Sequence, residues 1–319
     1  MGSPQSIGID IGGTKVAIAA LQDAKLSEPL AEPTALSSSE ELIEQIVRLV
    51  GDVRTADTRA IGLGVPSVID FATGRIRNSV NIPLVDVPLR TLLSERLGLP
   101  VYVDNDANCA ALAEAHEGGR VSSINLVMIT VGTGIGGGIV LNGRVFRGAT
   151  GAAPELGHIT IGLDLASGAP ELAGWPRPGT FEALASGTAL DELAEAAART
   201  NPDSPLGRLL SAEGKVTGRD AVTAAAAGDP VALEVVTIHG QRLGVGIANV
   251  INLFDPLEVV IGGGASAAGE LLLGPARETA ARYTLAGVGT LTSIRVARHG
   301  AQAGVLGAAL MAAQEEGLT

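Results

Sequence analysis

The residues best suited to chemistry lie in the stretch DNDAN, residues 104–108, which places two carboxylates and two carboxamides within five positions. An apolar, strand-like run precedes it and an alanine-rich helical pattern follows. Its first, third and fifth residues match the start of a calcium-binding loop. Calcium is nevertheless excluded, because Cys109 and Ala115 stand where that loop needs glycine and glutamate. A helix N-cap explains one of the four polar side chains, not all of them.

Two glycine-rich turns are candidates for binding phosphate. Residues 6–21 predict a strand, a Gly-Gly turn and a second strand, and residues 124–146 predict a similar hairpin followed by an Asn-Gly turn. Gly132, Gly134 and Gly137 match the dinucleotide fingerprint, but a strand follows them where that fingerprint needs a helix. The free N–H groups of such turns can clamp an anion, and glycine hairpins also simply bend sheets, so both interpretations stand.

Asp10 ends the apolar strand before the first turn. A buried carboxylate without a partner is costly, and Mg²⁺ held through water would satisfy it. Each turn also contains a threonine, Thr14 in the first and Thr133 in the second, roughly 120 residues apart. This spacing predicts a weak internal repeat.

Composition narrows the class of protein. The 319 residues are 46% hydrophobic but only 2% aromatic, and the formal net charge is −12, which argues against non-specific nucleic-acid binding. The single cysteine, Cys109, excludes an internal disulfide and a multi-cysteine metal cluster, and it fits a small buried hydrophobe. The sequence has no signal pattern and no membrane-spanning run, so we expect a soluble, cytoplasmic protein.

Strand-like and helical periodicities alternate along the chain, which predicts an α/β fold. Ser38 and Glu41 suggest a capping box, and Asp229-Pro230 predicts the start of a long helix that ends near Phe254. The longest loop is 166–180. The other predicted elements are helices over 37–53, 89–98 and 303–314, strands over 60–70, 100–105 and 257–262, and a mostly helical region from 181.

Five motifs resemble those of one known family. GIDIGGTK, DNDANCAALAE, VGTGIGGGIVLNG, PELGH and VVIGGGAS occur in this order and resemble the ROK family of bacterial sugar kinases and sugar-responsive repressors, most closely its glucokinases. The resemblance implies a duplicated actin/hexokinase-like (ribonuclease H-like) α/β fold with a cleft between two domains. It further implies domains at 1–118 plus 302–319 and at 119–301, and a homodimer.

The resemblance also implies roles for individual residues in an ATP- and Mg²⁺-dependent transfer to a hexose, glucose at its 6-hydroxyl being the expected acceptor. Asp106 matches the general base that takes the hydroxyl proton. The residues that match sugar ligands are Asn81, Asn105, Glu155, His158 and Glu182. Those that match the nucleotide site are Gly12, Gly13, Thr14, Lys15, Gly132, Thr133, Gly134 and Gly136 for the phosphates, and Gly262, Gly263 and Gly264 beside the adenosine, with Asp10 holding Mg²⁺ through water.

Two features depart from the family pattern. Members usually bind a structural zinc through the histidine of PELGH and three cysteines, but the corresponding stretch here contains no cysteine, so zinc is not expected. We expect the longer proline-rich loop, pinned by Trp175, to fix Glu182 instead. Ser67 and Pro154 also replace expected glycines beside the sugar residues, which leaves the identity of the sugar open.

Several alternatives remain open at this point. The protein could phosphorylate N-acetylmannosamine, fructose or mannose, or use polyphosphate as the donor, because pocket shape decides such differences. A sugar-responsive regulator is disfavoured, since the first strand begins at Ser6 and leaves no room for a DNA-binding module, and the chain is acidic. Lys15 fits a position near phosphate or one in solvent. The histidines expected to be structural or exposed are His116, His239 and His299.

Overall fold

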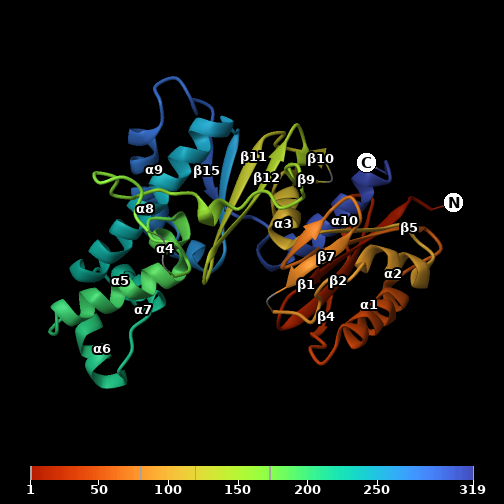
Figure 1. Ribbon diagram of the computed structural model, residues 1–319, viewed down its shortest axis with the longest axis horizontal. Coiled ribbons are helices and arrows are strands. Elements are labelled where there is room, and N and C mark those ends of the chain that lie inside the picture. Colours follow the sequence, from red (N-terminus) through yellow and green to blue (C-terminus); the bar gives the residue numbers. More distant parts are fainter. Residues whose placement is uncertain (1, 80, 119, 172–173, 319) are drawn as a thin grey trace. The chain divides into compact units, whose positions relative to one another are not determined.

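The computed structural model describes residues 2–79, 81–118, 120–171 and 174–318 (Figure 1). The chain forms two compact units. Unit 1 comprises Met1–Met128, Gly138–Pro154 and Arg298–Thr319, and unit 2 comprises Ile129–Gly137 and Glu155–Ala297. The domain limits given above stay predictions.

Unit 1 is built on a six-stranded sheet. Its order is β3-β2-β1-β5-β8, with β4 paired to β2. Strand β1 is antiparallel to β2 and parallel to β5, and β5 is parallel to β8. The strands are β1 Gln5–Ile11, β2 Lys15–Gln22, β3 Lys25–Leu26, β4 Leu30–Pro33, β5 Thr58–Val65 and β8 Val101–Asn105; two small hairpins pair β6 Ser67–Asp70 with β7 Arg75–Ser79 and β9 His116–Glu117 with β10 Arg120–Val121.

Four helices belong to unit 1: α1 Ser39–Val53, α2 Leu89–Leu97, α3 Asp106–Glu114 and α10 Ala303–Glu315. The predicted capping box of α1 is only half formed. Ser38 accepts a hydrogen bond from the N–H of Glu41, but the Glu41 carboxylate accepts from Ser37 instead. Helix α2 ends at Gly98, as predicted, and this glycine adopts the left-handed conformation.

Helix α10 packs directly on the backbone of the unit 1 sheet. A β-carbon on Gly8 in β1 would overlap the carbonyl oxygen of Val305, and one on Gly62 in β5 would overlap that of Ala308. The predicted helix of small residues therefore allows a close contact between helix and sheet that larger side chains would prevent.

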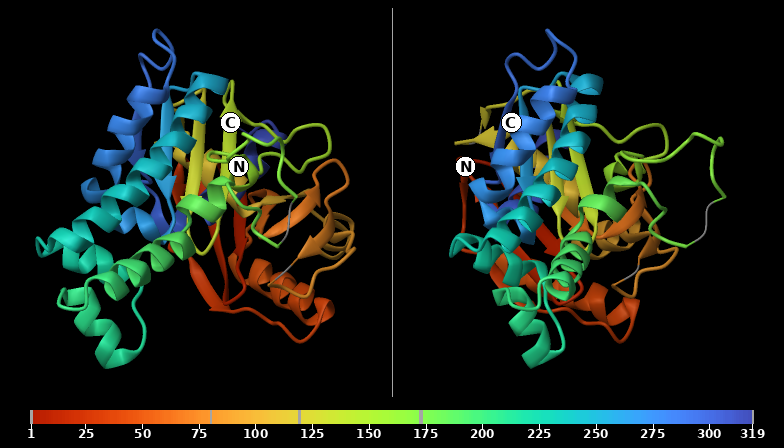
Figure 2. Two further views of the ribbon diagram at one scale, coloured as in Figure 1. Left: turned by 60° about the vertical axis from the view of Figure 1, so that its left-hand side comes forward. Right: turned by 90° about the vertical axis from the view of Figure 1, so that its left-hand side faces the viewer.

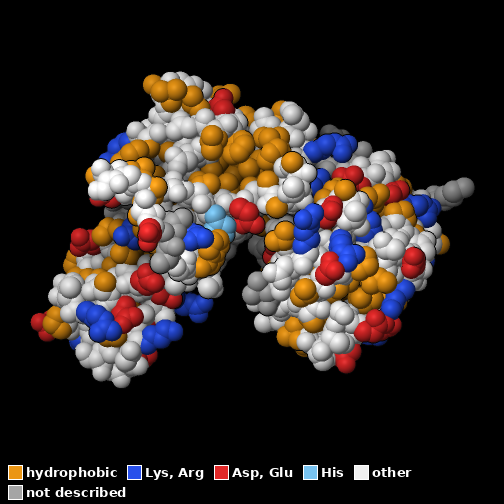
Figure 3. Space-filling model, in the orientation of Figure 1, with side chains coloured by type: hydrophobic (Ala, Val, Ile, Leu, Met, Phe, Trp, Pro, Cys, Tyr) orange, Lys and Arg blue, Asp and Glu red, His pale blue; other side chains and the backbone are white. Residues whose placement is uncertain are grey.

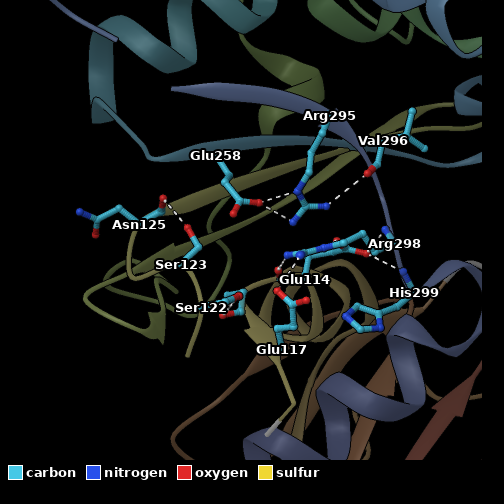
Figure 4. A network of polar contacts seen from close by, with 11 residues as sticks. Glu114, Glu117, Ser122, Ser123, Asn125, Glu258, Arg295, Val296, Arg298 and His299 are labelled. Atoms are coloured by element: carbon cyan, nitrogen blue, oxygen red, sulfur yellow. Dashed lines mark hydrogen bonds and ion pairs between the residues drawn. The ribbon is translucent and has the colours of Figure 1, made fainter. Parts of the chain in front are cut away.

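A buried carboxylate ties the segment before α10 to the end of α3 (Figure 4). The Glu114 side chain is fully buried, and its Oε1 accepts hydrogen bonds from the backbone N–H groups of Arg298 at 2.7 Å and His299 at 2.9 Å. The Arg298 guanidinium also pairs with Glu117 at 3.1 Å. These contacts fix the point at which the chain enters α10.

A second sheet repeats the order of the first. Its order is β13-β12-β11-β14-β15, with β12 antiparallel to β13 and β14 parallel to β15. The same succession of a central strand, an antiparallel hairpin partner and two later strands confirms the predicted duplication. The Asn142-Gly143 turn also forms, with φ of 53° and 75°. The strands are β11 Leu126–Val131, β12 Ile135–Leu141, β13 Arg144–Val145, β14 Glu258–Gly262 and β15 Ser293–Val296.

Helices dominate the rest of unit 2, as predicted. The long helix α8, Pro230–Phe254, is capped by Asp229 and packs beside α9, Glu270–Tyr283 (Figure 2). No single helix among the described residues is long and apolar enough to cross a membrane. Helix α8 and the helix before it, Gly218–Ala226, form a bent pair that matches a membrane span in length and composition only. The other helices are α4 Phe181–Ala185, α5 Gly187–Thr200, α6 Pro205–Glu213 and α7 Gly218–Ala226, and the 3₁₀ turns of the chain are η1 Leu156–His158, η2 Gly264–Ala268 and η3 Gly300–Gln302.

Candidate active site

The polar stretch at the start of α3 divides into two functional pairs. Asp104 is buried, and its carboxylate accepts hydrogen bonds from Asn108 Nδ2 at 2.9 Å and Arg147 Nε at 2.7 Å. Asp104 and Asn108 therefore hold the junction between β8 and α3. Asn105 caps α3 by accepting from the Ala107 N–H at 2.9 Å, and its Nδ2 lies 3.4 Å from the Ser67 carbonyl. Of the four polar residues of this stretch, Asn105 and Asp106 stay the predicted site residues, whereas Asp104 and Asn108 have partners within unit 1.

Asp106 and Asp10 are two carboxylates of unit 1 whose pKa the fold raises. Burial raises the pKa of Asp106, although its bond from the Ala107 N–H opposes that shift. Burial, together with the nearby charge of Asp106, raises the pKa of Asp10 to about 6, and Lys15 opposes this shift. Gly304 in α10 makes room for Asp10, because a β-carbon there would lie 2.5 Å from the carboxyl carbon. Both carboxylates are therefore destabilised in their charged forms, which favours a nearby cation.

The first glycine turn joins β1 to β2 in unit 1. Its backbone is fixed by the bond from the Gly12 N–H to the Lys15 carbonyl at 2.9 Å and by Thr34, whose hydroxyl donates to Gly12 O at 2.6 Å. Gly13 lies against Asn81, since a β-carbon on Gly13 would be 3.1 Å from that of Asn81. The structure thus brings a predicted sugar residue next to this turn. Thr14 and Lys15 are exposed.

The second glycine turn, between β11 and β12 in unit 2, is hydrogen-bonded to Glu182, a residue predicted to bind the sugar. The backbone N–H of Ile135 donates to Glu182 Oε2 at 2.9 Å, and a β-carbon on Gly134 would overlap that oxygen. The Gly132 carbonyl accepts from the Gly187 N–H at 2.7 Å. Gly136 lies one residue further along, within β12. This turn therefore positions a carboxylate as well as offering N–H groups.

Glu155, His158 and Glu182 gather in unit 2, as the sequence predicts. His158 Nε2 lies 3.8 Å from Glu155 Oε2, and the Glu155 side chain is 60% exposed. Partial burial and the charge of Glu182 raise the pKa of Glu155, while His158 lowers it. Two carboxylates and an imidazole at the surface of one unit are suited to bind several hydroxyl groups.

A cavity of ≈ 380 Å³ lies beside the second glycine turn. Gly132, Thr133 and Gly264 line it, and their predicted role in binding nucleotide stays a prediction. Gly262 ends β14. Gly263 has φ of 80°, and a β-carbon on it would overlap the Val131 backbone, so a side chain there would be strained. The lining residues that the sequence analysis missed are Thr188, Asp191, Gly218 and Arg219, which lie at the starts of α5 and α7.

The missed residues had only a weak signal in the sequence. In sequence, Thr188 and Asp191 are ordinary positions of an amphipathic helix. The one local signal is Ser186, the N-cap residue of α5, which lies two residues before Thr188. In the structure the Thr188 hydroxyl donates to the Thr133 carbonyl at 2.8 Å, and Asp191 accepts from the Gly218 N–H at 2.6 Å. These bonds join the glycine turn to two helix starts.

The residues around His158 do not fit a structural zinc. Trp175 lies against the imidazole, with ring centroids 4.6 Å apart, and Cys109 is buried in α3 of unit 1. Within 2–79, 81–118, 120–171 and 174–318, no group of three or more His, Cys, Asp or Glu side chains is arranged to hold a metal. One imidazole would leave most of a tetrahedral shell empty.

The histidines that the sequence analysis set aside have surroundings of their own. His116 is buried and its Nδ1 contacts the Leu112 carbonyl at 2.8 Å. His239 is fully buried in α8, where burial lowers its pKa to about 4. His299 donates its backbone N–H to Glu114 at 2.9 Å. Cys109 is 1% exposed, and burial raises its pKa, so it is the inert small hydrophobe that was predicted.

The two matching sheets define the class of the fold, an actin/hexokinase-like duplication of α/β units, and solved structures agree. A ROK family glucokinase from Streptomyces griseus, in complex with glucose and AMPPNP, is 32% identical with a TM-score of 0.75, covering 97% of this chain and 99% of that one. A ROK hexokinase from Thermus thermophilus is 35% identical with a TM-score of 0.77, covering 98% and 99%.

Comparison with known protein sequences identifies the family of this chain. A glucokinase from Halalkalibacterium halodurans is 38% identical over 318 residues, which is 97% of this chain and 95% of that protein. The model of the ROK family matches residues 6–315. The chain belongs to the ROK family.

Proposed function

We propose that this protein is an ATP- and Mg²⁺-dependent sugar kinase that phosphorylates glucose at its 6-hydroxyl. The observation that carries the proposal is Asp106, a largely buried carboxylate with a raised pKa at the first residue of α3. A raised pKa suits a general base, because it lies closer to the working pH. The likeness to a glucokinase crystallised with glucose and a nucleotide analogue supports the choice of substrates.

The acceptor side of the reaction uses carboxylates and amides. Asp106 would accept the proton of the 6-hydroxyl as its oxygen attacks the γ-phosphorus, and the bond from that phosphorus to the bridging oxygen would break to release ADP. Asn81, Asn105, Glu155, His158 and Glu182 are proposed to hold the other hydroxyls. Positioning of this kind contributes most of the catalysis in phosphoryl transfer.

The donor side uses backbone N–H groups and Asp10. The turns at 12–15 and 132–136 would donate N–H bonds to the phosphates, and Gly262, Gly263 and Gly264 would lie beside the adenosine. Asp10 fits Mg²⁺ held through water, since a cation would offset the burial and the repulsion that raise its pKa. When bound, the ion would neutralise charge on the transferring phosphoryl group.

The experiment is a coupled ADP-release assay over a panel of sugars and donors. We expect glucose with ATP to have the highest kcat/KM among glucose, mannose, fructose and N-acetylmannosamine, and polyphosphate to be a poor donor. A higher kcat/KM for another sugar would show that the protein is a kinase for that sugar and not a glucokinase. Absence of turnover with every pair would reject the kinase proposal.

A sugar-responsive regulator is the second candidate, because the family includes repressors. Such a protein would need to contact DNA phosphates through Lys and Arg. The net charge of −12 opposes this, and Asp and Glu are interspersed with Lys and Arg on the face shown in Figure 3. We therefore favour the kinase; the cytoplasmic location and the homodimer remain predictions.

A further inference from the structure

The only tryptophan of the chain lies on the predicted sugar ligand His158. The two ring centroids are 4.6 Å apart with an interplanar angle of 52°, which is a usual distance for an attractive aromatic pair. The Trp175 ring is nevertheless 66% exposed. The guanidinium carbon of Arg177 lies 5.7 Å from its centroid, within the range of a cation–π contact. Because Trp175 is exposed and makes both contacts, its role is not to fill the hydrophobic core.

The loop that carries Trp175 is closed at its base by backbone hydrogen bonds. Thr160 pairs with Thr180 in an isolated bridge, the Phe181 N–H donates to Ile159 O at 2.8 Å, and the Ile161 N–H donates to a loop carbonyl, that of Gly179, at 2.9 Å. His158 immediately precedes this tie and Glu182 immediately follows it. The tie therefore sets the spacing of the two backbones that present these side chains.

The backbone tie does not fix the rotation of the imidazole. His158 Nδ1 is buried and has no hydrogen-bond partner among the described residues, and Nε2 contacts Glu155 at 3.8 Å, longer than a hydrogen bond. Packing against a flat ring restricts the ring rotation that these weak polar contacts leave free.

We propose that Trp175 is a positioning residue that orients His158 for the sugar, and that the 159–181 tie and this ring pair together replace the zinc of the family pattern. The inference rests on the proposed sugar-kinase function. It assigns Trp175 no contact with the reacting atoms, so its effect should fall on sugar binding more than on phosphoryl transfer.

The kinetic experiment compares Trp175→Ala, Trp175→Phe and a matched control, Leu165→Ala, which removes an exposed side chain from the same loop. We expect Trp175→Ala to raise the KM for sugar about three- to tenfold, the factor that corresponds to an ordinary aromatic pair, with the KM for ATP within about twofold. Trp175→Phe should restore most of the sugar KM, and Leu165→Ala should leave both constants unchanged. An unchanged sugar KM in Trp175→Ala, an equal rise for ATP, or no rescue by phenylalanine would overturn the proposal.

Two further measurements do not depend on turnover. In Asp106→Asn, the emission of the single tryptophan should change on titration with sugar, and bound sugar should protect it from acrylamide quenching. Unchanged emission with a sugar that isothermal calorimetry shows to bind would overturn the role of Trp175 while leaving the kinase proposal intact. Metal analysis of the purified protein should find substoichiometric zinc; one zinc per chain would overturn the replacement.

Discussion

The backbone N–H of Ile135 donates a hydrogen bond of 2.9 Å to Oε2 of Glu182, 47 residues away in the sequence. The donor belongs to a turn whose glycines were interpreted as a phosphate loop, and the acceptor is a predicted sugar ligand. One short turn of unit 2 is therefore both the predicted phosphate loop and the backbone partner of a predicted sugar-binding carboxylate, because its glycines leave room for that carboxylate beside the backbone.

Replacing Gly134 by alanine should weaken sugar binding. The added methyl group would overlap Glu182 Oε2, so the carboxylate must move and give up its bond to Ile135. A lost hydrogen bond to a charged group costs roughly 1.5–3 kcal/mol, which predicts a rise in the sugar KM of about 10- to 100-fold. Steady-state kinetics measure the change. The control is Gly274→Ala in α9, where a β-carbon meets nothing within 4 Å, and equal behaviour of both variants would contradict the assignment.

Asp106→Asn should abolish most turnover while preserving nucleotide affinity. Asparagine keeps the shape of the side chain but cannot accept the hydroxyl proton, so kcat should fall by about 10²–10⁴. Rates come from the ADP-release assay and affinity from calorimetry with a non-hydrolysable nucleotide. Asp52→Asn on the exposed face of α1 is the matched control. Turnover of Asp106→Asn within tenfold of the unaltered protein would exclude Asp106 as the base.

Asp10→Asn should stabilise the ligand-free protein at neutral pH while reducing its activity. The folded pKa of about 6 exceeds the unfolded value of 3.8, so the folded state binds the proton more tightly, and stability is lost as pH rises from about 4 through 6. The neutral variant avoids this loss. We expect a gain of roughly 1–3 kcal/mol at pH 7.5 and almost none at pH 3.5, measured by urea unfolding without Mg²⁺. A gain of equal size at both pH values would show that the effect is not ionisation.

Glu114→Ala should destabilise unit 1 strongly. The change removes the partner of two backbone N–H groups and of Arg298 at a fully buried position. Breaking a buried charged interaction costs roughly 3–5 kcal/mol, to be read from the free energy of unfolding in urea. Glu117→Ala also removes a partner of Arg298, but its side chain is 71% exposed, so it should cost less than about 1 kcal/mol. If both variants lose a similar free energy of unfolding, the buried contacts of Glu114 do not contribute more than the exposed pair of Glu117.

The sequence predicted those features that local chemistry determines. The helix that begins at Pro230, the end of α2 at Gly98 and the Asn142-Gly143 turn each follow from residues adjacent to the feature itself. The two glycine turns in the sequence indicated the repeated order of the two sheets, because each turn joins the two strands of the hairpin at the centre of its sheet.

Features that depend on distant residues were not predictable in this way. The division of DNDAN into a buried pair and an available pair depends on Arg147, which comes from another segment. Asp191 and Arg219 line the cavity because two helices begin there, and nothing in their own helices distinguishes them. The predicted pairing of Glu41 failed for a smaller reason, competition from the neighbouring Ser37 hydroxyl.

The close contact of α10 with β1 and β5 has a consequence for biosynthesis. Strands β1 and β5 depend on a helix that is translated after both sheets, so the ribosome must add residues up to 315 before the unit 1 sheet can acquire its covering layer. Until then these nascent strands expose apolar surface, and chaperone capture or aggregation during synthesis should be most sensitive to truncations that remove α10.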